Sequence, residues 1–485
     1  MTSPRDPSRT LAPREWIVAI AVSLVLLTAL RPATLATPYW WDAGAVYVPG
    51  AQWLVEHGFQ AMPGTFPSDL GRGHTPGFYL VLALVFRVFG TTPTTGHALV
   101  LATASTAIVL TYALGTWWIG RVRAVFATML LVCSPLFLTM SSEALPEIPM
   151  TALTLAALYA FARSRFVWSA IACTALVLCK EVGVACPLAI GGACAIMAWR
   201  SRGDVRTTWV RAAAWQTMPV AVLVVFFGWQ RLREGWFVLP YHAGLWSEKH
   251  DLAEQLRRVF GSPLVDDGRW MAVLAALGFI VWMRVRTRPK SEVAEARDPF
   301  AAIGIAMVLV VVANVTFFSK MFFLERYILP IHPVVVLFIA RAIVPRTPRM
   351  RMIGAGAVFA ACAAGVRARW GGVGFDSGET TFRYLHAVRV HQRLLSEIPA
   401  STTVFTAWPM TDELRRPYLG YVTQPIHTLS LENAEATGTR PRMDAVVVFG
   451  TMGNASRLRD IAIGRGFQLK RSESEEGATI ELWEP

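Results

Sequence analysis

Residues 38–79 read PYWWDAGAVYVPGAQWLVEHGFQAMPGTFPSDLGRGHTPGFY, a polar segment rich in glycine, proline and aromatic residues inside a largely apolar chain. A loop of this length is usually functional or disordered, and its aromatic content argues against disorder. Tryptophan and tyrosine are also typical of segments at a lipid–water interface. Asp42 directly follows Trp40 and Trp41. We therefore predict an ordered external loop that holds a reactive carboxylate against the outer membrane surface.

The rest of the chain is apolar enough to cross a membrane many times. Its 485 residues are 54% hydrophobic and only 16% charged, and the mean hydropathy is +0.42. Apolar runs of about 20 residues recur, as an α-helical polytopic membrane protein requires. We predict about eleven transmembrane helices, at 16–31, 97–118, 124–140, 149–162, 166–179, 182–199, 213–232, 270–283, 299–318, 327–345 and 352–366.

The net charge of +13 is explained by membrane topology. When the N-terminus is placed in the cytoplasm, each cytoplasmic segment carries arginines, from Arg14 before the first helix to Arg351 before the last. This is the positive-inside rule. The charge distribution therefore indicates a multi-pass protein of the plasma or inner membrane and gives no sign of a nucleic-acid partner.

Two shorter helices are predicted within the first external loop, 32–96. The run 77–90 is short and contains Arg87, and the arginine pattern would invert after it if it crossed the membrane. We expect it to lie on the outer interface. Residues 49–57 are expected to form a second such helix, with Pro49 in its first turn.

Three other external turns are expected to face this loop. They are 141–148, which holds Glu143 and Glu147, the turn at Lys180 and Glu181, and 319–326, which ends at Arg326. A longer external loop, 233–269, joins them without a diagnostic spacing. Each charge at such a turn either flanks a helix in solvent or belongs to a shared site.

Four pieces in this order resemble the C-type (GT-C) membrane glycosyltransferase superfamily, in its protein O-mannosyltransferase and aminoarabinose lipid A transferase branch. They are WWDAGAVYVPGAQWLVEHGF (40–59), GHTPGFYLVLALVFRVFG (73–90), SPLFLTMSSEALPEIPMTALTLAALYAF (134–161) and ERYILPIHPVVVLF (325–338). The resemblance implies a GT-C-like fold and a membrane enzyme that uses a polyprenyl-phosphate sugar as donor.

The chemistry of such a transfer assigns roles to three residues. Displacing a phosphate from an anomeric carbon requires a base on the opposite face that takes the acceptor proton, as in inverting glycoside chemistry. Asp42 is the candidate catalytic base, and its alternative role is bracing the loop. Cations must neutralise the charge that develops on the leaving phosphate. Lys180 and Arg326 are the candidates for binding the donor phosphate, with Glu181 as the expected partner of Lys180; each cation could instead merely flank a helix.

Further candidates surround these three. His74 could hydrogen-bond the phosphate or ligate a metal. Glu143 and Glu147 lie about one helical turn apart, so either could help Asp42 bind a divalent metal ion or contact the acceptor. Three aromatic residues could stack on sugar or lipid, or simply lie in the interfacial belt: Trp40, Trp41 and Tyr47.

The composition changes after residue 369. Residues 370–485 are polar, with short apolar runs at 401–407, 444–450 and 478–483 and helical patterns at 380–397 and 455–466. This alternation predicts a small soluble α/β domain behind a transmembrane domain of residues 1–369. The odd number of spans places it outside the cytoplasm. If the short, Ala/Gly-rich run 352–366 is not a span, the domain is cytoplasmic instead.

The sequence thus favours a glycosyltransferase that moves a sugar from a polyprenyl-phosphate donor to a glycan, lipid or protein acceptor at the extracytoplasmic face. Two alternatives remain open. A transporter or flippase of lipid-linked sugars would place charges near the bilayer midplane. A catalytically inactive relative could act in binding or assembly, and Ala43, where the family often has Glu, agrees with that alternative.

Overall fold

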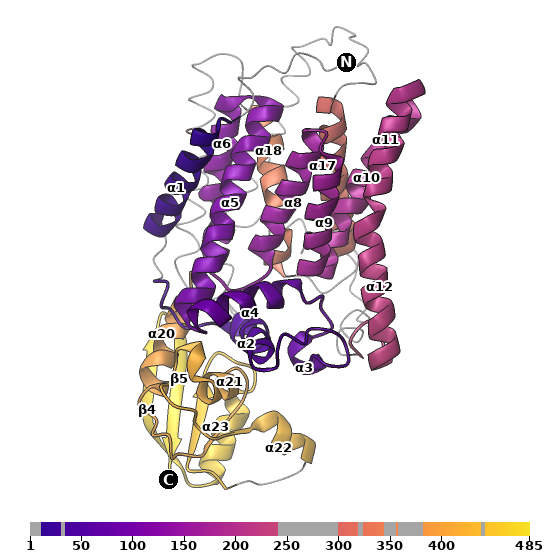
Figure 1. Cartoon of the computed structure of the whole chain (residues 1–485). Coiled ribbons are helices and arrows are strands. Elements are labelled where there is room, and N and C mark those ends of the chain that lie inside the picture. The colour runs from indigo at the N-terminus through magenta and orange to yellow at the C-terminus, as the bar shows by residue number, and fades with distance from the viewer. Residues whose placement is uncertain are drawn as a thin grey trace.

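A computed structural model describes residues 11–30, 34–240, 299–318, 324–343, 356, 382–437 and 442–485. The helices predicted at 270–283 and 352–366, and most of the external loop 233–269, lie outside these ranges. Within them, a bundle of roughly parallel helices lies on one side of the molecule, and a small sheet with its helices lies on the other (Figure 1).

Apolar helices form the bundle because they can bury side chains against one another and expose the rest to lipid. Among the described residues, five helices are long and apolar enough to cross a membrane: Pro13–Leu30, Pro93–Ile119, Glu181–Arg200, Gly203–Glu234 and Phe300–Phe318. Four shorter apolar helices accompany them: Gly77–Phe89, Glu147–Ala162, Phe166–Cys179 and His332–Arg341. A mostly helical protein with several apolar helices is thus confirmed, and the number of eleven spans stays a prediction.

The bundle elements follow in chain order. They are α1 (Pro13–Leu30), α5 (Pro93–Ile119), α6 (Arg121–Val132), α7 (Pro135–Met140), α8 (Glu147–Ala162), α9 (Phe166–Cys179), the short helix η3 (Glu181–Val184), α10 (Ala185–Arg200), α11 (Gly203–Trp215), α12 (Thr217–Glu234), α17 (Pro299–Phe318), η6 (Glu325–Ile328) and α18 (His332–Ile343).

Two predicted helices differ in extent from those observed. The run 124–140 is broken where the Ser134 side chain accepts a hydrogen bond from the Phe137 amide and Pro135 begins α7. The helix predicted at 213–232 corresponds to α12 (Thr217–Glu234), and a separate helix, α11 (Gly203–Trp215), precedes it because this arginine-rich segment is amphipathic. Trp209 is buried there while Arg206 is exposed, so the charges lie on one face of a helix and not in a loop.

The first external loop folds across one end of the bundle (Figure 1). It contains a π-helical turn, η2 (Ala43–Tyr47), followed by α2 (Val48–Glu56), α3 (Ser68–Gly71) and α4 (Gly77–Phe89). A helix the length of α4 spans about 20 Å, which is less than the ~30 Å of a bilayer core. Its crosswise position agrees with the predicted interfacial helix.

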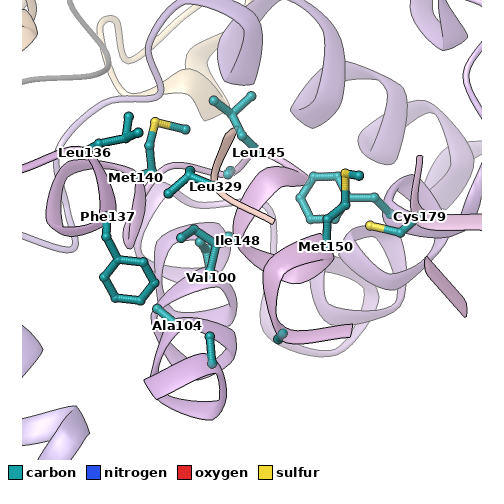
Figure 2. Packing of buried hydrophobic residues seen from close by; sticks show 14 of the residues in the cluster. Val100, Ala104, Leu136, Phe137, Met140, Leu145, Ile148, Met150, Cys179 and Leu329 are labelled. Carbon is teal, nitrogen blue, oxygen red and sulfur yellow. The ribbon is translucent and has the colours of Figure 1, made fainter. Parts of the chain in front are cut away.

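Buried apolar side chains pack together where α5, α7 and α8 meet. Figure 2 shows Phe137 and Met140 of α7 packed near Val100 of α5 and Ile148 of α8, with Leu329 beside them. All five side chains are less than 2% exposed. This packing fixes the ends of α7 and α8, and therefore the turn between them that carries Glu143 and Glu147.

The C-terminal region forms a five-stranded mixed sheet in the order β2-β1-β3-β5-β4. β1 is parallel to β2 and β3, while β5 is antiparallel to both β3 and β4. The three predicted strands and two predicted helices are present, and the short β2 and the polar β4 are additional. The elements are α20 (Tyr384–Leu395), β1 (Val404–Thr406), α21 (Met410–Arg415), η7 (Pro417–Leu419), β2 (Thr428–Ser430), α22 (Leu431–Thr437), β3 (Ala445–Phe449), α23 (Ala455–Gly464), β4 (Gln468–Glu475) and β5 (Ala478–Glu484).

Candidate active site

Asp42 lies in the first turn of the helical segment that opens the external loop, directly before the π-helical turn η2. Its carboxylate binds the guanidinium of Arg326 through Oδ2 and Nη2, across 284 residues of sequence. Arg326 belongs to η6, the short helix that precedes α18. The contact therefore joins the loop after the first helix to the segment directly before α18, one of the last described helices.

Arg326 also reaches a second acid. Its Nε lies 3.5 Å from Oε1 of Glu147, the first residue of α8. The same carboxylate oxygen accepts a hydrogen bond of 3.0 Å from Nζ of Lys180, which ends α9. We call Asp42, Glu147, Lys180 and Arg326 the buried charge network.

Three members of this network are almost inaccessible to solvent. The exposed fractions of the Arg326, Glu147 and Lys180 side chains are 3%, 2% and 7%, whereas 31% of the Asp42 side chain is exposed. Asp42 is thus the member that faces outward. A reacting molecule arriving from outside the bundle would meet the Asp42 carboxylate first and the two cations behind it.

Both cations stay charged despite their burial. Burial by itself lowers the pKa of Arg326, but the carboxylates of Asp42 and Glu147 outweigh it and raise the pKa above its ordinary value. Burial likewise lowers the pKa of Lys180, and Glu147 more than compensates and raises it. Tyr327 adds its ring, whose centroid lies 4.7 Å from Nζ of Lys180 and 5.7 Å from Cζ of Arg326, within the range of cation–π attraction.

Glu181 is not the partner of Lys180, contrary to the sequence-based expectation. Its carboxylate lies 3.0 Å from Nδ1 of His74, so His74 and Glu181 form a second pair. The physical reason is local: Lys180 has an extended backbone, with φ −160° and ψ 135°, and neighbouring side chains on extended backbone point in opposite directions. The Tyr47 ring stacks on His74 at 6.4 Å.

The remaining candidates lie at the boundary with the C-terminal sheet region. Oε1 of Glu143 accepts a 2.5 Å hydrogen bond from the Tyr384 hydroxyl of α20. Trp40 is 1% exposed and packs edge-on against His391 and Phe449. Trp40 is therefore inside the protein and is not available to stack on a ligand, and Tyr47 is buried as well. Trp41 is half-buried and lies 4.4 Å from the Trp408 ring.

The residues do not fit the divalent metal considered from the sequence. The acids that would share it, Asp42 and Glu147, both contact the Arg326 guanidinium, which lies between them. Glu143 is engaged with Tyr384. Within the ranges that the structure describes, no three His, Cys, Asp or Glu side chains gather as metal ligands would.

Sequence reasoning overlooked Tyr327, although it stands in the quoted ERYILP segment directly after Arg326. An aromatic residue next to a buried arginine was the available signal. Sequence reasoning also gave no hint of the aromatic partners from the C-terminal region, since Trp408 and Phe449 are separated from Trp40 and Trp41 by more than half of the chain.

Comparisons with known proteins place this geometry in context. No family model matches the chain, and no curated protein matches its sequence. Among solved structures, ArnT from Cupriavidus metallidurans bound to undecaprenyl phosphate superposes with a TM-score of 0.59 at 14% identity, covering 97% of this chain and 98% of ArnT. The oligosaccharyltransferase of Archaeoglobus fulgidus in its apo form gives 0.52 at 12% identity, covering 92% and 71% of the two chains.

The archaeal oligosaccharyltransferase AglB from Archaeoglobus fulgidus, in complex with an inhibitory peptide and a dolichol-phosphate, gives a TM-score of 0.50 at 12% identity, covering 93% of this chain and 71% of AglB. The likeness to ArnT extends over nearly the full length of both chains, including the sheet region. The chain therefore shares its fold with ArnT and with the archaeal oligosaccharyltransferase, which agrees with the GT-C-like fold that the four ordered motifs predict.

Proposed function

We propose that this protein is a glycosyltransferase that moves a sugar from a polyprenyl-phosphate donor to an acceptor at the extracytoplasmic face of the cell membrane. The observation that carries the proposal is the buried charge network, where two buried cations lie behind a half-exposed carboxylate. The fold supports it, since ArnT was solved with undecaprenyl phosphate and AglB with a dolichol-phosphate.

The cations are suited to hold the phosphate of the donor. Arg326 offers several N–H donors in one plane, which match phosphate oxygens, and Lys180 supplies a second positive charge nearby. Glu147 contacts both cations and keeps them oriented while no donor is bound. In the transition state these charges stabilise the negative charge that moves onto the leaving phosphate.

Asp42 is then the base of an inverting displacement. An acceptor hydroxyl attacks the anomeric carbon, and its proton passes to the Asp42 carboxylate as the new glycosidic bond forms. The bond from the anomeric carbon to the phosphate oxygen breaks, and its electron pair stays on the phosphate. The carboxylate suits this task because it is the solvent-facing member of the network.

Charge balance links the binding of the donor phosphate to the release of Asp42 from Arg326. The two carboxylates and two cations make the network neutral as a whole. An added phosphate would therefore leave excess negative charge in a buried site. The phosphate must therefore replace a carboxylate on Arg326. Asp42 is the carboxylate that can leave, because it is the more exposed of the two. The base is thus released from Arg326 when the donor is bound.

The proposal extends to the arrangement in the membrane. Residues 1–369 would form the transmembrane domain and residues 370–485 an extracytoplasmic domain, with the N-terminus in the cytoplasm. His74, paired with Glu181, would support the donor side of the site. The acceptor would be a glycan, a lipid or a protein that reaches the exposed side of Asp42.

The test measures transfer of radiolabelled sugar from a polyprenyl-phosphate donor to membrane acceptors by the purified protein. We expect Asp42→Asn to lower the rate by about 10²–10⁴-fold, the usual contribution of a general base. Asp69→Asn is the matched control, because Asp69 is an exposed acid of the same loop and should leave the rate unchanged. Full activity of Asp42→Asn would eliminate the proposed base, and movement of labelled lipid across the bilayer without covalent transfer would favour a flippase.

A further inference from the structure

The backbone on both sides of Asp42 departs from ordinary helical geometry. Trp41 has φ +50°, the left-handed region that is unfavourable for a residue with a bulky side chain. Directly after Asp42, residues Ala43–Tyr47 form a π-helical turn, a rare conformation that recurs at functional sites. Such geometry persists only where the surrounding structure imposes it.

The surrounding structure here is the C-terminal sheet region. The amide of Tyr39 donates a 2.9 Å hydrogen bond to the Leu419 carbonyl. Trp40 is enclosed by His391 of α20 and Phe449 of β3, with ring centroids 5.3 Å and 6.1 Å away.

Trp41 and the π-helical turn after Asp42 also contact the C-terminal sheet region. Trp41 meets Trp408 at 4.4 Å and 70°, and α21, just after Trp408, packs against the π-helical turn. Each of the three residues before Asp42 thus has a partner between residues 391 and 449.

We infer that the C-terminal sheet region is a positioning element for the base: it imposes the left-handed conformation of Trp41 and thereby fixes the place of Asp42, whose carboxylate meets Arg326 while no donor is bound. This inference rests on the proposed function for its consequence in catalysis. Trp41 and Trp408 act through Asp42 and are positioning residues. This role replaces the stacking on sugar or lipid that Trp41 was predicted to provide.

Two substitutions of the same residue separate positioning from substrate contact. Trp41→Ala and Trp41→Gly both remove the indole and its contact with Trp408. Glycine adopts positive φ without steric penalty, whereas alanine does not. A role in stacking on substrate would make the two variants equally defective, and a role in holding the backbone makes alanine worse.

The first readout is sugar transfer. We expect kcat of Trp41→Ala to fall at least about fivefold below that of Trp41→Gly, as the cost of a left-handed alanine implies. The KM for the polyprenyl-phosphate donor should not rise, because Lys180 and Arg326 still bind its phosphate and Asp42 no longer competes for Arg326. Trp408→Phe should keep the aromatic contact and restore most of the kcat lost in Trp408→Ala. Equal kcat of the two Trp41 variants, or wild-type kcat of Trp408→Ala, would overturn the inference.

The second readout requires no catalysis. A water-soluble carbodiimide with an amine labels carboxylates, and mass spectrometry of the full-length protein reports the yield at Asp42. We expect higher labelling in Trp41→Ala than in the wild type or Trp41→Gly, because the carboxylate leaves Arg326. Equal labelling in all three would refute the positioning role. If the wild-type protein transfers no sugar while this pattern appears, the proposed function fails and the positioning role stands.

Discussion

Two networks of charged side chains in this molecule have similar distances and different surroundings. In the buried charge network, Nζ of Lys180 lies 3.0 Å from Glu147 at side-chain exposures of 7% and 2%. In the C-terminal region, Arg393 of α20 lies 2.9 Å from Glu475 of β4 at exposures of 45% and 23%. We call the second group the sheet-face network; its other members are His386, Arg389 and Glu473.

The difference shows which charges mark a function. Exposed ion pairs are screened by water and salt and contribute little, and they also suit a polar edge strand such as β4. Buried ion pairs must compensate for the loss of hydration of both partners, and they often stabilise a fold less than apolar residues would. Three buried charges and one partly exposed acid at one end of a bundle therefore point to a function rather than to stability.

The largest effect that distinguishes the buried charge network from the sheet-face network is expected on removing one buried acid. Glu147→Gln leaves Lys180 and Arg326 buried with less compensating charge, and we expect the free energy of unfolding to fall by about 3–5 kcal/mol. The measurement is equilibrium unfolding of the full-length protein in mixed micelles. The double variant Glu147→Gln/Lys180→Met restores the charge balance and should recover part of this loss.

The control for this experiment lies in the same bundle. Glu15 of α1 pairs with Arg121 at 3.1 Å, and both side chains are exposed, at 37% and 48%. Glu15→Gln should cost less than about 1 kcal/mol. Equal losses for Glu15→Gln and Glu147→Gln would contradict the distinction between the two kinds of network.

A smaller effect is expected in the sheet-face network. Burial raises the pKa of Glu475, but hydrogen bonds from His386, Arg389 and Arg393 outweigh it and lower the pKa to about 2. A carboxyl whose folded-state pKa is lowered contributes stability above its unfolded value of about 4.3. That contribution is lost as the pH falls from about 4.3 towards about 2.

Glu475→Gln removes this contribution, so the thermal stability of the variant should approach that of the wild type as the pH falls through this window. At neutral pH the difference should stay below about 1 kcal/mol and shrink further in high salt. The measurement is thermal unfolding of both proteins as a function of pH and salt. A difference that grew on acidification would show that the sign of the linkage is wrong.

Much of the bundle was predictable because its signal is local. The helices at 166–179 and 299–318 end where the sequence predicts, since each apolar run is bounded by charged or polar residues. The helix α11, which starts at Gly203, was missed because its arginines indicated a loop, whereas they share an amphipathic helix with buried residues such as Trp209. β4 was missed for a related reason: it is an edge strand whose sequence, QLKRSESE, has no apolar face.

In the candidate site, the charged residues could be predicted from local sequence, but their contacts with one another could not. Asp42, Lys180 and Arg326 were identifiable as charges close to the ends of apolar runs. Their pairing was not, because the contact between Asp42 and Arg326 spans 284 residues and no sequence period encodes it. The burial of Trp40 depends in the same way on Phe449 of β3, which lies more than half of the chain away.

The central claim is that the buried charge network binds a lipid-linked phosphate, and ligand-induced stabilisation tests it most directly. With undecaprenyl phosphate at about 100 times its Kd, wild-type protein should gain about 2.7 kcal/mol of stability. Asp42→Asn should gain at least as much, because Arg326 is then released from its carboxylate, while Arg326→Gln should gain little. Uncharged undecaprenol serves as the control for the lipid chain. Equal stabilisation by undecaprenol, or undiminished stabilisation of Arg326→Gln by undecaprenyl phosphate, would contradict the claim.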